Sequence, residues 1–202
     1  IDRRDAAREP AHLAQTLNNL GHARRDRRDF AGAEAAHRES LARRRALWGD
    51  DHFEVSVALI NLAGVLTDRG AFGEADSLYR QGLALRRRLT GEGHPDLALD
   101  RAGYARVLHL RGDLAESERL YRQALAVLER ALPPEHPKVA TASAGLGSLL
   151  LDLGRPEEAV PLLEAALAAR RRALVPGHWQ IAEVERALAA ARGDAADKSG
   201  GA

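Results

Sequence analysis

The chain has 202 residues, with 30 basic and 29 acidic side chains and no cysteine. This near balance of charge gives no general attraction to nucleic acid or to anionic membranes, and the lack of cysteine excludes disulfides, thiolate metal sites and a cysteine nucleophile. No apolar run reaches transmembrane length and no signal peptide opens the chain, so we expect a cytoplasmic protein. Because the chain begins with Ile1 and contains no methionine, we expect a processed product or a piece of a longer protein.

A period of 42 residues organises the sequence. Its clearest columns are His52, His94, His136 and His178; Ala33, Ala75, Ser117 and Ala159; Leu41, Leu83, Leu125 and Leu167; and Gly70, Gly112 and Gly154, with Arg28 in the first copy. Self-similarity at a fixed period of about 20–50 residues is typical of a solenoid of stacked units. Apolar residues at helical spacing predict two helices in each unit.

In chain order, a flank at 1–10 precedes four repeats, which cover about 11–52, 53–94, 95–136 and 137–178. The expected helix pairs are 11–27 with 30–48, 53–69 with 72–89, 95–110 with 114–132, and 137–153 with 156–174. Pro161 should kink the last of these helices or delay its start. A ninth helix at 179–191 should close the C-terminal end, and residues 193–202 are expected to be disordered.

The small residues resemble those of the tetratricopeptide repeat. They are Gly21, Ala63, Ala105 and Gly147 in the first helices, with the alanine and serine column above in the second helices. Tyr79 and Tyr121 occupy the aromatic position of this family, from which His37 and Leu163 depart. Three features resemble the kinesin-light-chain-like type, which is common in bacterial multidomain proteins. They are the 42-residue length, the segments Leu17-Asn18-Asn19-Leu20 and Ile60-Asn61-Leu62-Ala63, and the Gly91–Pro95 turn.

The resemblance covers residues 11–192 and implies an all-α fold. It would be a right-handed α-solenoid of four helix-turn-helix repeats plus a C-terminal capping helix. First-helix positions line the inner groove in this family. The candidate groove residues are Gln15, Asn18, Asn19, His22, Arg25, Asn61, Arg106 and His109.

Asparagine is a poor residue in the middle of a helix, so its repeated use there needs a compensating reason. We expect Asn18, Asn19 and Asn61 to hydrogen-bond the backbone of an extended peptide. Arg25, Arg106 and His22 would then select acidic or polar side chains. The alternative for the asparagines is an interhelical hydrogen bond that fixes repeat packing. In that case, replacing Asn18 and Asn61 by alanine would lower thermal stability.

Two other patterns have structural interpretations. Successive periodic histidines cannot converge on one metal ion, because packed helices lie about 8–10 Å apart. We expect these histidines to cap or pack at helix junctions, with partner contact as the alternative. The arginine runs at 43–45, 86–88 and 170–172 lie near helix C-termini, where cations are favourable. They are expected to form a solvated face, with phosphate or acidic-partner binding as the alternative.

The sequence holds no phosphate loop, no HExxH motif and no nucleophile elbow, so we expect no enzyme, no cofactor and no metal site. The expected function is to bind a protein or peptide in the groove, with no nucleic-acid or membrane partner. One alternative is a regulatory or sensor segment of a larger kinase or NTPase that acts on its own catalytic domain. Another is a scaffold that self-assembles through its exposed ends.

Overall fold

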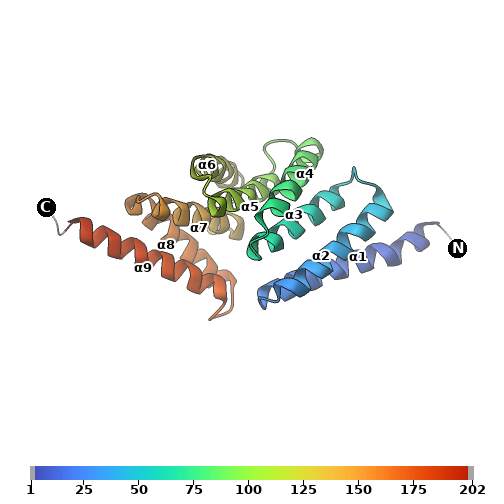
Figure 1. The fold of residues 1–202 in the computed structure, drawn as a ribbon, viewed down its shortest axis with the longest axis horizontal. Helices are drawn as coiled ribbons and strands as arrows, with labels where there is room; N and C mark the ends of the chain where they lie inside the picture. Colours follow the sequence, from blue (N-terminus) through green and yellow to red (C-terminus); the bar gives the residue numbers. More distant parts are fainter. Residues whose placement is uncertain (1–2, 200–202) are drawn as a thin grey trace. The chain divides into compact units, whose positions relative to one another are not determined.

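A computed structural model describes residues 3–199 and the side chains of residues 9–193. Its helices are α1 (Arg3–Asp26), α2 (Phe30–Trp48), α3 (Phe53–Asp68), α4 (Phe72–Thr90), α5 (Pro95–Arg111), α6 (Leu114–Ala131), α7 (Pro137–Asp152), α8 (Pro156–Ala173) and α9 (Trp179–Ser199) (Figure 1). No strand occurs within residues 3–199. The predicted all-α helical repeat is therefore confirmed. Among the described residues, no helix has both the length and the apolar character needed to span a bilayer.

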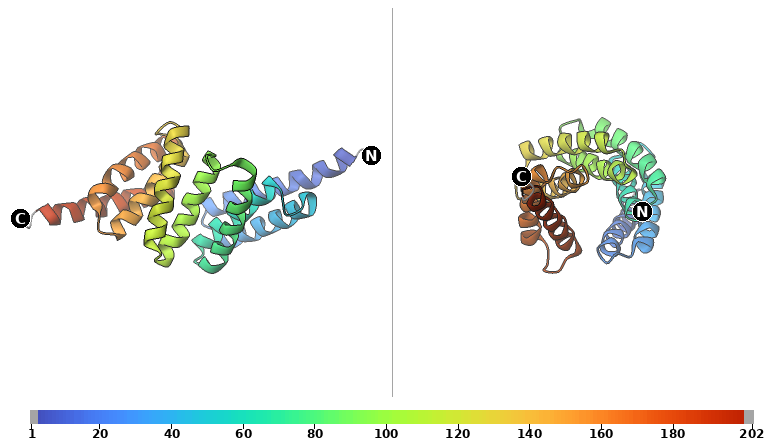
Figure 2. Two further views of the ribbon diagram at one scale, coloured as in Figure 1. Left: turned by 90° about the horizontal axis from the view of Figure 1, so that it is seen from above. Right: turned by 60° about the vertical axis from the view of Figure 1, so that its left-hand side comes forward.

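The chain divides into two compact units, one ending at Glu92 and the other beginning at Gly93. In unit 1, α1 packs on α2, α2 on α3 and α3 on α4. In unit 2, each of α5 to α8 packs on the helix that follows it, and the first helices α5 and α7 also touch. Figure 2 shows the same helix pairs from two further sides. Each unit thus stacks its helices in sequence order, as a solenoid does.

Small residues allow the two helices of a repeat to approach closely. The second-helix column of Ala33, Ala75, Ser117 and Ala159 is fully buried. In the first helices, a Cβ added to Gly21 would lie 2.5 Å from the His37 ring, and one added to Gly147 would lie 2.7 Å from the Leu163 side chain. Helix contact thus explains the small residues in both columns.

The periodic histidines cap the N-terminal ends of α3, α5, α7 and α9. His52 Nδ1 accepts a hydrogen bond from the Glu54 backbone N–H at 3.2 Å. The same bond joins His94 to Asp96, His136 to Lys138 and His178 to Gln180, at 3.1–3.3 Å. Each ring satisfies one of the N–H groups that a helix start leaves without an intrahelical partner. The capping interpretation of this column is confirmed.

The turn between the two helices of a repeat requires a left-handed backbone. Gly70, Gly112 and Gly154 have φ values of 77°, 89° and 70°. Arg28, which stands at this position in the first repeat, has φ 62°. A side chain in this region is strained, so Arg28 keeps the turn at a cost that glycine avoids.

The two ends of the chain differ from the prediction. Helix α1 begins at Arg3 and runs through Pro10, so the expected flank is largely helical. Helix α9 continues to Ser199, beyond its expected end at 191. Alanine favours helix in both segments. Of the tail expected to be disordered, 193–199 is helical and 200–202 lies outside the described residues. Helix α8 begins at Pro156 and includes Pro161, so its start is not delayed.

Candidate protein-binding surface

The first helices of unit 1 are joined by two polar contacts. Asn61 Nδ2 donates to Asn18 Oδ1 at 2.8 Å, and Arg25 Nε donates to Asp68 Oδ2 at 2.6 Å. Asn18 is 6% exposed and the Asp68 side chain 5% exposed. The contact between Asn18 and Asn61 has the geometry of the packing alternative, in which the asparagines hold one repeat against the next.

A second polar row lies on α1 beside these contacts. The buried Arg44 of α2 donates from Nη2 to Gln15 Oε1 at 2.9 Å, and Gln15 Nε2 donates to Asn19 Oδ1 at 2.9 Å. Gln15, Asn19 and His22 are exposed. Because the row starts from a buried guanidinium, its amides are oriented before any partner arrives.

His22 meets a buried histidine of α2. The rings of His22 and His37 make an edge contact with centroids 5.1 Å apart. Burial, with the nearby His22, Arg25 and Arg44, lowers the pKa of His37 to about 4. Within the described residues, neither His37 nitrogen has a hydrogen-bond partner. Burial and Arg25 also lower the pKa of His22, so its imidazole favours neutral polar groups over acids.

The other two candidate residues lie on α5 in unit 2. His109 Nε2 lies 2.6 Å from Asp152 Oδ2. In the 42-residue repeat, these two residues occupy the positions that Arg25 and Asp68 hold two repeats earlier. Arg106 is half-buried. The positions of Asn18 and Asn61 are taken by Ala102 and Gly145 in this unit. Six candidate residues therefore lie on α1 and α3 of unit 1, while Arg106 and His109 lie on α5 of unit 2.

Ion pairs between second helices and the next repeat recur in both units. In unit 1, Glu34 pairs with Arg69, and Arg38 Nη2 donates to Glu74 at 2.9 Å. In unit 2, Arg155 pairs with Glu118 and Arg122 with Glu158, at 2.9 and 2.8 Å. These charges bind repeats to one another.

The sequence prediction missed that one arginine of each run is buried. Arg44, Arg86 and Arg170 are 1%, 4% and 9% exposed. Arg44 Nη1 donates to the Glu54 carbonyl at 3.0 Å and pairs with the Glu54 carboxylate. Arg170 donates to the Gln180 carbonyl at 2.7 Å. The prediction of a solvated face is therefore wrong for these three side chains, because each of them is buried. The available signal was that all three occupy the same position of the 42-residue repeat, where the third copy has Leu128.

Other arginines of the runs lie nearer the surface, several of them beside acids. Arg45 Nε is 2.8 Å from Asp50, Arg43 Nη2 is 2.7 Å from Glu39, and Arg88 pairs with Asp51. These pairs offset much of the charge that a phosphate would need. Within the described residues, no group of three or more histidines, aspartates or glutamates could hold a metal ion.

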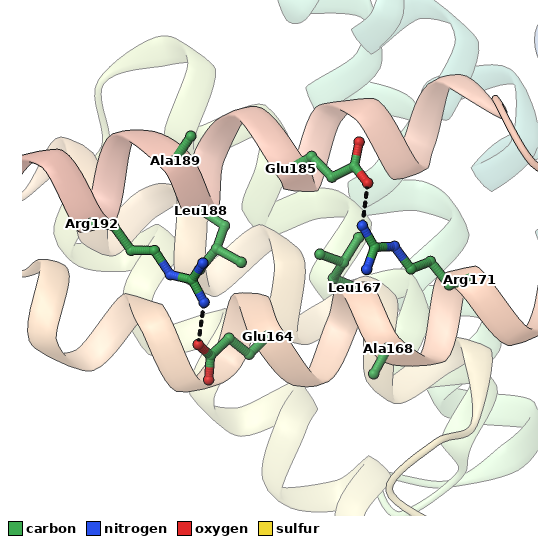
Figure 3. Close-up of a pocket in the computed structure, with 8 residues that line it drawn as sticks. All are labelled: Glu164, Leu167, Ala168, Arg171, Glu185, Leu188, Ala189 and Arg192. Atoms are coloured by element: carbon green, nitrogen blue, oxygen red, sulfur yellow. Dashed lines mark hydrogen bonds and ion pairs between the residues drawn. The ribbon is translucent and has the colours of Figure 1, made fainter.

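The last helix covers the end of unit 2. Ile181, Val184 and Leu188 of α9 are 7%, 2% and 6% exposed. A groove of about 410 Å³ lies between α8 and α9. Figure 3 shows Leu167 and Leu188 among the residues that line it. Two ion pairs bridge this groove, Arg171 with Glu185 at 2.6 Å and Arg192 with Glu164 at 2.7 Å. The apolar stripe predicted for this helix is therefore buried, and charged pairs lie at its rim.

Stacked helix pairs with capped, 42-residue repeats define a helical repeat solenoid. The tetratricopeptide repeat model matches residues 12–88, 54–130 and 96–172. The chain belongs to the tetratricopeptide repeat family. Repeats of this family generally mediate protein–protein interaction, and no catalytic family is indicated.

Solved structures share the fold. The crystal structure of BtubC (BKLC) from P. vanneervenii is 23% identical with a TM-score of 0.70, covering 93% of this chain and 75% of that one. A putative kinesin light chain of Podosopora anserina with nearly identical TPR-like repeats is 22% identical with a TM-score of 0.69, covering 94% and 90%. A second crystal structure of those repeats has the same identity and TM-score. The search of curated proteins finds no significant match.

The buried amide contact leads to a stability prediction. Replacing Asn18 by alanine removes the acceptor for Asn61 Nδ2 and should lower the free energy of unfolding by about 1–2 kcal/mol. Replacing the exposed Asn19 should change it by less than about 0.5 kcal/mol. Urea unfolding followed by circular dichroism measures both. Equal stability of the Asn18→Ala variant and the parent chain would show that the contact does not hold the repeats together.

Proposed function

We propose that unit 1 binds an extended peptide segment of a partner protein along α1 and α3. The observation that carries this proposal is the preorganisation of the amides of Gln15 and Asn19 on α1 and of Asn61 on α3. Rigid, oriented amides lower the ordering cost of binding.

The hydrogen bonds within the protein determine what each amide offers to a partner. Asn61 Nδ2 is engaged by Asn18, which turns the Asn61 carbonyl toward a peptide N–H. Asn19 Oδ1 is engaged by Gln15, which turns its NH₂ group toward a peptide carbonyl. A donor and an acceptor on neighbouring helices match the alternating groups of an extended backbone. Asn18 acts here as a positioning residue.

Charge selection on this surface is weak. Arg25 is tied to Asp68 at 2.6 Å, so much of its charge is neutralised by the protein. The lowered pKa of His22 leaves it a neutral donor or acceptor at neutral pH. We therefore expect the bound segment to carry small polar side chains beside α1. Arg106 and His109 would form a separate contact on α5.

Peptide selection on the intact chain tests this proposal. Peptides are selected from a random phage library, and their affinity is measured by fluorescence anisotropy for the parent chain and for an Asn19→Ala/His22→Ala variant. Loss of two polar contacts should weaken binding about ten-fold or more while the melting temperature stays nearly constant.

The matched control is Gln81→Ala, which removes an exposed amide from the second helix α4. This variant should bind as the parent does. Selected peptides that bind the Asn19→Ala/His22→Ala variant as tightly as the parent would place the binding surface elsewhere.

A further inference from the structure

A groove of about 560 Å³ lies in unit 2 between the second helices α6 and α8, beside α7, which packs on both. Its inner part is apolar, because Leu125, Leu146 and Leu150 line it and are 7%, 2% and 1% exposed. Arg122 of α6 pairs with Glu158 of α8 at 2.8 Å and joins the two walls. Three consecutive helices of one unit therefore form the whole groove.

Two acids line this groove without taking part in the ion pairs between repeats. They are Glu129 on α6 and Glu157 on α8, and both are exposed. Among the described residues, neither carboxylate makes a hydrogen bond or an ion pair. The other three repeats carry arginine at the position of Glu129, and alanine or glycine at that of Glu157. The two unpaired negative charges thus belong to this groove alone among the four repeats.

Glu129 is unfavourable for its own helix. It lies in the last turn of α6, which ends at Ala131, and the partial negative charge of a helix C-terminus repels a carboxylate there. The arginines at the same position are attracted to the ends of their helices; they are Arg45, Arg87 and Arg171. An acid that destabilises its own helix indicates a role outside that helix.

Pro161 is a second locally unfavourable residue in the same groove. Inside α8 it lacks the backbone N–H that would bond to the Glu157 carbonyl, which weakens the helix. The other repeats have Ala35, Ser77 and Arg119 at this position. The Pro161 ring is exposed and adds apolar surface to the groove. Helix-destabilising residues on both walls of one groove support a binding role for it.

The two unpaired acids define the charge and the spacing that a ligand needs. Glu157 is the neighbour of Glu158, which pairs with Arg122, so Glu157 lies near the level of Arg122 on α6. Glu129 is seven residues farther along α6, which is about 10 Å along the helix axis. An extended chain covers about 10 Å in three residues. We propose that this groove binds an extended segment of a partner protein with two basic side chains three residues apart and apolar side chains between them.

This surface is a second one, additional to the proposed peptide site on α1 and α3. The basic side chains of the segment pair with the carboxylates of Glu129 and Glu157, and an apolar side chain between them covers the leucines of the groove. Both contributions are needed, because exposed ion pairs alone bind weakly.

The probe is a fluorescently labelled peptide, Gly-Arg-Leu-Leu-Arg-Gly, and its affinity for the full chain is measured by fluorescence anisotropy. It should bind about five-fold or more tightly than Gly-Glu-Leu-Leu-Glu-Gly, which reverses the charges, and than Gly-Arg-Ser-Ser-Arg-Gly, which removes the apolar side chains. Added salt should weaken binding of the probe, because the ion pairs are exposed.

Variants of the full chain locate the interaction. Glu129→Arg introduces the residue of the other repeats, so it should raise the melting temperature while weakening probe binding about five-fold or more. Ala126→Gln places a longer side chain in the groove and should also weaken binding. The control is Glu135→Arg, at an exposed acid in the turn after α6, which makes the same change of charge and should leave binding unchanged. The Asn19→Ala/His22→Ala variant should bind the probe as the parent does.

Four results would overturn the proposal. The acidic peptide could bind as tightly as the basic one, or the Glu129→Arg chain could bind the probe as tightly as the parent. Equal losses with Glu135→Arg and Glu129→Arg would assign binding to general charge attraction. A loss confined to the Asn19→Ala/His22→Ala variant would place the probe on α1 of unit 1 instead of in the groove.

Discussion

Lowering the pH from about 7.5 to about 4.5 should reduce the free energy of unfolding of unit 1 by about 2.5 kcal/mol. The cause is a single imidazole, that of His37. The ring is fully buried between α1 and α2, and within the described residues neither nitrogen has a hydrogen-bond partner. Burial and the nearby His22, Arg25 and Arg44 lower the pKa of His37 from 6.5 to about 4.

The direction of the effect follows from the two pKa values. As the pH falls below 6.5, the unfolded chain takes up a proton on this residue while the folded chain does not. The stabilisation is therefore fully present above pH 6.5 and is lost as the pH falls toward 4. About 1.4 kcal/mol should be lost by pH 5.5.

A His37→Leu variant isolates this contribution. Leucine stands at the same position in the last repeat, as Leu163, which is fully buried. Urea unfolding of both chains at several pH values gives a stability difference in which the titration of the shared carboxylates cancels. The variant should become more stable relative to the parent as the pH falls. A difference that stays constant with pH would show that the pKa of His37 is the same in the folded and the unfolded chain.

The second large effect is expected at Arg44. Replacing it by alanine should destabilise unit 1 by about 3 kcal/mol, because a buried side chain and its bonds to Glu54 and Gln15 are lost together. Arg44→Met keeps most of the apolar stem and should cost about half as much. Thermal and urea unfolding measure both variants.

Neighbouring arginines provide the control. Arg45 is largely exposed and pairs with the exposed Asp50, so Arg45→Ala should change stability by less than about 0.5 kcal/mol. Similar losses for Arg44→Ala and Arg45→Ala would mean that burial of the Arg44 guanidinium contributes nothing. A loss of peptide binding with Arg44→Met would further link this residue to the orientation of Gln15 and Asn19.

Local signals made most of the fold predictable. The helix bounds inside the repeats follow from apolar spacing and from the glycine and histidine columns, since each acts within one turn of its own helix. The ends were less predictable. At Arg3 and Ser199 the column pattern runs out, and only helix propensity remains.

The contacts made by the candidate residues were less predictable than the helices that carry them. Asn18 and Asn61 are 43 residues apart, one more than the repeat, so their contact depends on how one first helix is shifted along the next. The buried arginines were visible as a column, but burial of a charge depends on carbonyl acceptors that no sequence pattern displays. His37 stood out as a departure from the aromatic position, whereas its missing partners are a property of three-dimensional packing.

The inter-repeat contacts of unit 1 span short stretches of chain. Four of these contacts join residues only 35–43 positions apart. They are Asn18 with Asn61, Arg25 with Asp68, Glu34 with Arg69, and Arg38 with Glu74. All eight partners exist once residue 74 has been synthesised. The first two repeats can therefore pack against each other while the ribosome is still translating the following ones. Little unpaired helix surface that could aggregate is then exposed during synthesis.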